Sequence, residues 1–143
     1  MLSSHQHSAA AEDHADRVRR STSSAINAEI DRRTQANIRH FSGLGRQQVI
    51  QRIGELEREW DIERILETNA ATLALTGLVL GLTVNRKWLW LPGVVLPFLL
   101  QHGLQGWCPP LPILRRLGVR TRGEIDREKY ALLETLQEIP YAG

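Results

Sequence analysis

Two long stretches without charge, separated by a short basic turn, constrain this chain more than any other feature. Residues 68–84 and 88–107 contain no Asp, Glu, Lys or Arg, and only the tripeptide NRK separates them. A helix needs about 20 mostly apolar residues to cross the hydrocarbon core of a bilayer, with about 17 as the lower end. We therefore expect two membrane-spanning helices joined by a tight turn, a transmembrane hairpin over residues 68–108.

The aromatic residues of the second stretch favour a membrane over a soluble interior. Trp88 and Trp90 stand at its start and Trp107 at its end, and tryptophan rings concentrate at membrane–water interfaces. The alternative is a helical hairpin buried inside a soluble protein. It is disfavoured because the rest of the chain offers too little amphipathic structure to cover two helices that are apolar all round.

Basic residues predict the orientation of this hairpin. The turn offers Arg86 and Lys87, whereas the flanks offer more, and cytoplasmic segments carry the excess of Lys and Arg. The flanking residues are Arg46, Arg52, Arg58 and Arg64 before the first stretch, and Arg115, Arg116, Arg120 and Arg122 after the second. We therefore expect both termini in the cytoplasm and the turn outside.

Small residues predict where the first helix packs. They recur at helical spacing and so share one helix face, and they are Ala70, Ala74, Gly77 and Gly81. In lipid, close backbone approach through small residues favours helix association. This face suits either the second helix of the same chain or a second copy of the chain, and the first is preferred.

A polar cluster is expected near the cytoplasmic end of the hairpin, where the first helix starts and the second ends. Its members are Asn69, Gln101, His102 and Gln105. Polar groups in lipid need partners, so interhelical hydrogen bonding is the main interpretation. The alternatives are a ligand or proton site around His102, or several copies of the chain lining a path for a small ion.

The segment before the hairpin, residues 42–67, is expected to be an amphipathic cytoplasmic helix capped by Ser42. Its apolar face carries Val49, Ile53, Leu56 and Trp60 at helical spacing, and charged residues occupy the other face. Such a helix lies on a membrane surface or pairs with another helix or a protein partner.

Residues 109–143 predict an interfacial turn followed by another amphipathic helix. In the turn, Arg115 and Arg116 are expected to reach lipid phosphates. Thr121 and Glu124 predict a capping box at the start of the helix. The apolar stripe of this helix consists of Ile125, Leu132, Leu136 and Ile139. We expect the stripe to pack on the apolar face of residues 49–60, which makes a small cytoplasmic helical layer.

Residues 1–41 form a polar arm, which we interpret as a marginal helix or a disordered segment because its apolar stripe is narrow. The arm contains His5, His7 and His14. Such a tail is a weak metal-binding signal, so these histidines are expected to be solvated.

Cys108 is the only cysteine of the chain and the candidate functional thiol. The preferred interpretation is structural, a small and mildly apolar residue where a helix breaks. One alternative is redox or sulfur chemistry, with Arg115 and Arg116 near enough in sequence to lower the pKa of the thiol. The others are lipidation of a juxtamembrane cysteine and axial haem ligation.

Two segments resemble a known family. They are "WDIERILETNAATLALTGLVLG" and "GWCPPLPILRRLGVRTRGEIDREKYAL", and they look like the YgaP-type transmembrane domain of bacterial inner-membrane proteins. The Gly-x-Cys-Pro turn of that family corresponds to residues 106–109, and its later short segment to Leu117, Gly118 and Thr121. The resemblance covers roughly residues 58–133 and implies a two-helix hairpin in the bacterial inner membrane. In the family this domain stands alone or carries a rhodanese, and this chain resembles the stand-alone form.

The sequence thus predicts an all-α membrane protein, a two-helix transmembrane hairpin with flanking cytoplasmic amphipathic helices. We expect a non-enzymatic accessory or scaffold subunit that contacts the lipid bilayer and binds another membrane protein or its own copies. No cofactor or metal site is expected, because the chain lacks a phosphate-binding glycine loop, an HExxH motif and a nucleophile elbow. The formal net charge of +2 does not indicate nucleic-acid binding.

Overall fold

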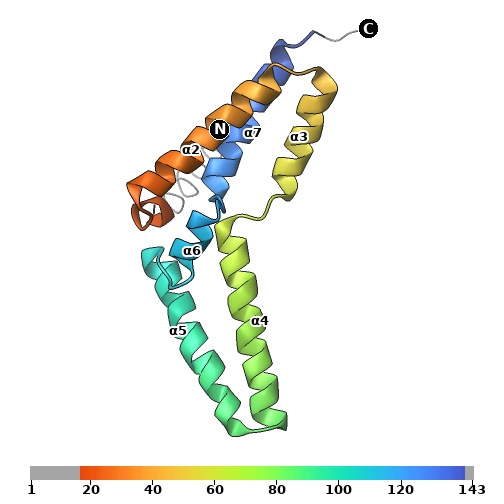
Figure 1. Ribbon diagram of the computed structural model, residues 1–143. Coiled ribbons are helices and arrows are strands. Elements are labelled where there is room, and N and C mark those ends of the chain that lie inside the picture. The colour runs from red at the N-terminus through yellow and green to blue at the C-terminus, as the bar shows by residue number, and fades with distance from the viewer. Residues whose placement is uncertain (1–16, 141–143) are drawn as a thin grey trace, which may run out of the picture.

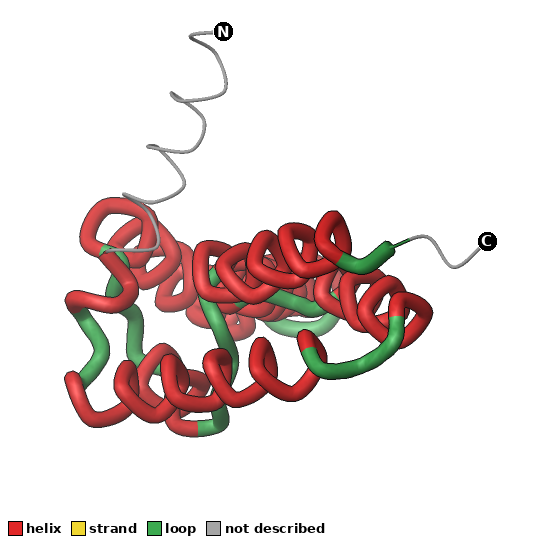
Figure 2. The backbone as a smooth tube through the Cα atoms, turned by 90° about the horizontal axis from the view of Figure 1, so that it is seen from above, coloured by secondary structure: helices red, strands yellow, loops and turns green. Residues whose placement is uncertain are grey.

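The computed structural model describes residues 17–140, and every regular element in that range is a helix (Figures 1 and 2). The all-α prediction is therefore confirmed for the described residues. The elements are α2 (Ser24–Ser42), α3 (Arg46–Arg58), α4 (Ile62–Thr83), η1 (Arg86–Leu89), α5 (Trp90–Gln105), α6 (Leu111–Arg116) and α7 (Arg122–Glu138). A helical turn at residues 17–20 precedes α2. The histidines His5, His7 and His14 lie outside the described residues.

The helices divide into two parts (Figure 1). Helices α4 and α5 run side by side in antiparallel directions and project away from the rest of the chain. Helices α2 and α3 both pack against α7, and we call these three helices the helical layer. The short α6 lies between the end of α5 and the start of α7, at the junction of the two parts.

One helical stretch between residues 17 and 140 is long and apolar enough to cross a membrane, judged by length and composition alone. It covers Arg46–Thr83, and its apolar part is α4, because α3 is rich in charged residues. Only 17% of its apolar window is buried within the chain, whereas the core helix of a soluble protein is mostly buried. Helix α5 is shorter than the expected span of 88–107, because Trp88 and Leu89 belong to η1.

The segment expected as one helix over residues 42–67 is broken. Helix α3 ends at Arg58, and α4 starts after Asp61, whose carboxylate accepts a hydrogen bond from the backbone N–H of Arg64 at 2.8 Å. An aspartate at this position satisfies an N–H group that has no partner inside the helix. This cap allows α4 to leave the layer in a new direction.

The prediction that Ser42 caps this segment is wrong. Ser42 is the last residue of α2, and Gly45 is the N-cap of α3 without any side-chain hydrogen bond. The Ser42 hydroxyl lies instead 3.2 Å from the Thr135 hydroxyl of α7.

The layer has its own apolar core, which we call the layer core. Its buried members are Val49, Leu56, Ile125 and Leu132, and partly buried Phe41, Ile53, Leu136 and Ile139 pack against them. Helix α7 begins with the predicted capping box, in which the Thr121 side chain and the Glu124 side chain each bind the other's backbone N–H. The apolar face of α3 and the apolar stripe of α7 therefore pack against each other in the layer core.

Most of the described part of the polar arm belongs to helix α2, which packs against the rest of the layer. Helix α2 lies along α7 and buries Ile30 and Thr34. Its stripe is as narrow as the sequence indicates. Because α7 covers that stripe, the helix does not depend on a wide apolar face of its own.

Candidate functional site

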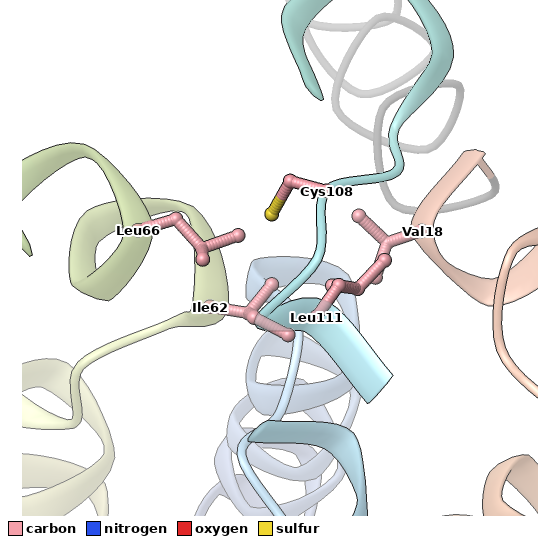
Figure 3. Close-up of a cluster of buried hydrophobic side chains, with 5 residues drawn as sticks. All are labelled: Val18, Ile62, Leu66, Cys108 and Leu111. Carbon is pink, nitrogen blue, oxygen red and sulfur yellow. The ribbon is translucent and has the colours of Figure 1, made fainter. Parts of the chain in front are cut away.

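Cys108 lies at the junction between the two long helices and the layer (Figure 3). It belongs to a cluster of buried side chains, the junction cluster, whose members are Val18, Ile62, Leu66, Cys108 and Leu111. The Cys108 side chain is 4% exposed, and its sulfur points toward Leu66. The cluster joins the N-terminal turn, the start of α4 and α6 around one small apolar residue.

This environment does not activate the thiol. Burial raises the pKa of the Cys108 thiol, and the backbone N–H of Leu111 opposes this effect only in part. A reactive cysteine needs a lowered pKa, from a nearby cation or a helix N-terminus. Arg115, one of the two expected cations, has its guanidinium committed to Glu124. The geometry therefore favours the structural interpretation of Cys108.

Gly106 explains the tight turn just before the cysteine. Its φ of 72° lies in the left-handed region, and its backbone N–H donates to the carbonyl of His102 at 2.8 Å. A side chain at this position would place a Cβ atom 2.8 Å from the Cβ of Arg17 and 3.0 Å from its carbonyl carbon. Both the backbone conformation and the close approach of the N-terminal segment require glycine here.

The small-residue face of α4 contacts the following segment of the same chain. Gly77 and Gly81 are buried, and Ala70 and Ala74 are half-buried. A Cβ atom added to Gly77 would lie 2.5 Å from Cδ of Pro92, and one added to Gly81 would lie 2.5 Å from Cδ2 of Leu89. The structure therefore favours the intrachain use of this face over a contact with a second copy.

The expected polar cluster is not a hydrogen-bonded unit. Within the described residues no hydrogen bond joins Asn69 to α5, and the one bond inside the group runs along α5, from Gln101 to Gln105 at 3.4 Å. Asn69 and Gln105 are exposed. His102 is buried, and its Nδ1 atom has no hydrogen-bond partner in the described part of the chain. No hydrogen bond between the described residues therefore links the two helices through these four residues.

The predicted face of residues 49–60 divides between two environments. Val49, Ile53 and Leu56 belong to the layer core or pack on it, so they are not available to a partner. Trp60 differs, because it lies in the break between α3 and α4 and is 46% exposed. The Arg64 guanidinium stacks over its ring at 4.4 Å from the ring centroid.

Buried arginine–glutamate pairs hold the layer to the junction, and the first centres on Arg115. Its guanidinium donates to both carboxylate oxygens of Glu124, at 2.7 and 2.8 Å. Its other N–H groups donate to Thr22, Asn27 and the carbonyl of Val119. All five N–H groups of the guanidinium therefore have an acceptor. We call this set, with the Arg19 that also binds Glu124, the Arg115 network.

A second set, the Arg120 network, spans the break between α3 and α4. Arg120 donates from Nε to Glu59 at 2.9 Å and also pairs with the fully buried Glu128 of α7. Arg52 of α3 donates to Glu128 at 2.9 Å. The backbone carbonyl of Arg120 also accepts from the first N–H of α4, at Ile62 and 3.0 Å. The network therefore ties the start of the long helix to both α3 and α7.

The expectation that Arg115 reaches lipid phosphates is wrong. Arg115 is 1% exposed, whereas its neighbour Arg116 is exposed. The sequence did contain a signal for the networks. Glu124 and Glu128 stand four residues apart on α7, hence on one helix face. Arginines precede them at a spacing of four or five, since both Arg115 and Arg116 come before Arg120.

These networks predict acid sensitivity of the layer. Burial alone would raise the pKa of Glu124 and Glu128, but the arginines that bind them hold both pKa values below the ordinary 4.5. A carboxyl whose folded-state pKa is lowered stabilises the fold above its unfolded pKa and loses that effect as pH falls through the folded value. We expect the free energy of unfolding to stay level from neutral pH to about pH 5 and to fall below about pH 4.

Chemical denaturation of the purified chain across this pH range tests the expectation. Glu134→Gln removes an exposed carboxyl of the same helix and serves as the control, which should leave the pH curve unchanged. A free energy of unfolding that stayed level down to pH values well below 4 would contradict ionised Glu124 and Glu128 as stabilising groups.

No protein family, curated protein or solved structure matches this chain. The residues between 17 and 140 contain no group of three or more His, Cys, Asp or Glu side chains that could hold a metal ion.

Proposed function

We propose that this chain is a non-enzymatic membrane-anchored scaffold. In this proposal α4 and α5 insert into the bacterial inner membrane as a two-helix hairpin with both termini in the cytoplasm. Helices α2, α3 and α7 then form a layer at the cytoplasmic face that binds a protein partner. The resemblance to the YgaP-type transmembrane domain implies the same hairpin, and membership of that family is proposed together with this function.

The proposed membrane anchor is supported by the apolar side chains that α4 and α5 expose. Most of the large apolar side chains that the described residues expose lie between residues 73 and 107, including Leu75, Leu82 and Trp90, which are 62–77% exposed. The layer instead buries its apolar stripes in the layer core. Exposed apolar area of this extent is typical of a membrane or protein interface. Both elements are α-helices, which keep their backbone hydrogen bonds within the helix as lipid requires, and Pro97 removes one donor from α5.

The scaffold part is supported by the buried ion pairs. An exposed salt bridge contributes little to stability, but a buried pair fixes geometry because an unpaired partner is strongly destabilising. The Arg120 network connects the start of α4 to α3 and α7 in this way. A layer held rigidly to its anchor presents a defined surface at a fixed height above the membrane.

Topology mapping tests the proposal, since Cys108→Ala gives a background without any cysteine. Single cysteines are then introduced by Arg86→Cys in η1, Gln35→Cys in α2 and Gln137→Cys in α7, all at exposed positions. With a membrane-impermeant maleimide on intact spheroplasts, we expect labelling only at position 86. Positions 35 and 137 should be labelled only after permeabilisation.

The other labelling patterns exclude the hairpin and distinguish its alternatives. If α4 crosses the membrane and α5 does not, positions 35 and 137 will be labelled from opposite sides. If the protein is soluble, all three positions will require permeabilisation, and the chain will leave the membrane fraction during alkaline extraction. Either result would refute the two-span anchor.

Partner binding is tested separately, by native mass of the tagged chain purified from membranes in mild detergent. We expect a stoichiometric complex with another protein. Ile50 and Tyr130 are exposed apolar residues of the layer, so Ile50→Arg or Tyr130→Arg should weaken that complex. Gln137→Arg, at an exposed polar position, is the control. A bare monomer or a homo-oligomer would contradict the partner-binding role.

A further inference from the structure

Helix α6 has two faces with opposite character. Leu111 and Arg115 point inward and are almost fully buried. Ile113 and Leu117, which are four residues apart on the other face, are 63% and 72% exposed. The exposed Arg116 stands next to Leu117. Two largely exposed apolar side chains one turn apart, Ile113 within α6 and Leu117 at its C-cap, give the helix an apolar outer surface.

The position of α6 indicates which environment this outer surface faces. Leu111 packs with Ile62 and Leu66, so α6 lies against the first turns of α4 (Figure 3). Helix α6 therefore lies at the boundary between the two long helices and the layer (Figure 1). Trp107, which is 36% exposed, connects the apolar surface of α5 to this face along the chain. If α4 and α5 are in lipid, α6 is at the headgroups.

The charge of this face is complementary to phosphate. Arg116 makes no hydrogen bond or ion pair with any residue of the range 17–140, whereas Arg115 uses every N–H group on protein acceptors. The nearby Glu124 is 2% exposed and faces inward, so it does not neutralise Arg116. A guanidinium matches a phosphate with two parallel hydrogen bonds.

We propose that the outer face of α6 binds anionic phospholipids of the cytoplasmic leaflet. Ile113 and Leu117 enter the boundary between headgroups and acyl chains, as the apolar face of an interfacial helix does, while Arg116 binds a lipid phosphate. The inference rests on the proposed insertion of α4 and α5. It adds a lipid class and a specific residue to that function, and it fixes the height of the layer above the bilayer.

The test uses the full chain with Cys108→Ala, reconstituted in nanodiscs and carrying a fluorophore at one introduced cysteine. Leu117→Cys reports on α6 and Leu75→Cys on α4. Tyr130→Cys, at a position 64% exposed on α7, is the aqueous control. We expect lipids with a nitroxide on the headgroup to quench the label at position 117. Lipids with a nitroxide deep in the acyl chain should quench the label at position 75, and neither should quench position 130.

The preference for a lipid class is then measured at position 117. It is the ratio of quenching by spin-labelled phosphatidylglycerol to quenching by spin-labelled phosphatidylcholine. One arginine near a membrane surface contributes about 1 kcal/mol of attraction to anionic lipid, so Arg116→Gln should lower the preference for phosphatidylglycerol about fivefold. Arg39→Gln, which removes an exposed arginine of α2, should leave the preference unchanged.

The outcomes separate this inference from the proposed function. Quenching at position 75 without quenching at position 117 would overturn the lipid contact of α6 and leave the anchor intact. Quenching at position 117 that does not depend on Arg116 would overturn the phosphate contact. Absence of quenching at position 75 would overturn the anchor and the inference together.

Discussion

Replacement of Arg115 by methionine is expected to destabilise the helical layer by about 3–5 kcal/mol, the range measured when one partner of a buried ion pair is removed. Methionine keeps much of the apolar stem and removes the guanidinium. Glu124 would then stay at 2% exposure without its bidentate partner, and Asn27 and Thr22 would lose their donors. Hydrogen exchange of the α2 and α7 amides in detergent measures the loss, because it reports the free energy of local opening.

The neighbouring residue supplies the matched control. Arg116→Met makes the same chemical change at an exposed position, so we expect it to change stability by less than about 0.5 kcal/mol. A second variant identifies the cause. Adding Glu124→Gln to Arg115→Met removes the buried charge that has lost its bidentate partner and keeps an oxygen for the Thr121 N–H, so part of the loss should be recovered. Equal effects of the two single changes, or no recovery, would contradict the assignment.

Local patterns in the sequence predicted much of this fold. The helical character of the described residues follows from apolar periodicity, and the start of α7 follows from the spacing of Thr121 and Glu124. The spacing of Val49, Ile53 and Leu56 also indicated a face that packs against another helix. These features depend on residues within a few turns of each other, so the sequence carries them directly.

The features that the sequence did not predict depend on distant residues. Arg115 binds Thr22 and Asn27, which lie 93 and 88 positions away, and nothing near Arg115 distinguishes it from Arg116. In the same way, α2 gains its order from α7. The break between α3 and α4 depends on Arg120, which is 61 positions from its partner Glu59. A long apolar helix can be recognised from composition, but its direction relative to the layer depends on such contacts.

The difference between features set by local residues and features set by distant residues also applies to the candidate site. Composition identified Cys108 as the one thiol of the chain and limited the metal-binding motifs that needed consideration. Whether that thiol is reactive depends on its surroundings, and Val18 and Leu66 come from segments far from it in the chain. The signal that the sequence did offer, the paired spacing of Arg115 and Arg120 with Glu124 and Glu128, predicts an ion-pair set only once α6 and α7 are known to be adjacent.

Gly77→Ala is expected to destabilise the packing of α4 against α5 by about 1–3 kcal/mol, the usual effect of adding a methyl group to a closely packed interface. The new Cβ would lie 2.5 Å from Cδ of Pro92, 2.9 Å from Cβ of Leu91 and 3.1 Å from the backbone carbonyl oxygen of Trp88. Neither a proline ring nor a backbone carbonyl can move aside without shifting α5. Titration with SDS from mild detergent, followed by tryptophan fluorescence, measures the loss.

Gly93→Ala is the control, because apart from the adjacent residues and the backbone of its own helix no heavy atom lies within 4 Å of the position that its Cβ would occupy. In a helix interior this change should be neutral or stabilise by up to about 1 kcal/mol, since alanine favours the helix more than glycine does. The pair also decides between the two uses of the small-residue face. If the face serves α5 of the same chain, Gly77→Ala lowers the unfolding free energy at every protein concentration and leaves the native mass unchanged. If the face instead joins two copies, the same change lowers the native mass, and the loss of stability depends on concentration, because dissociation of a dimer does.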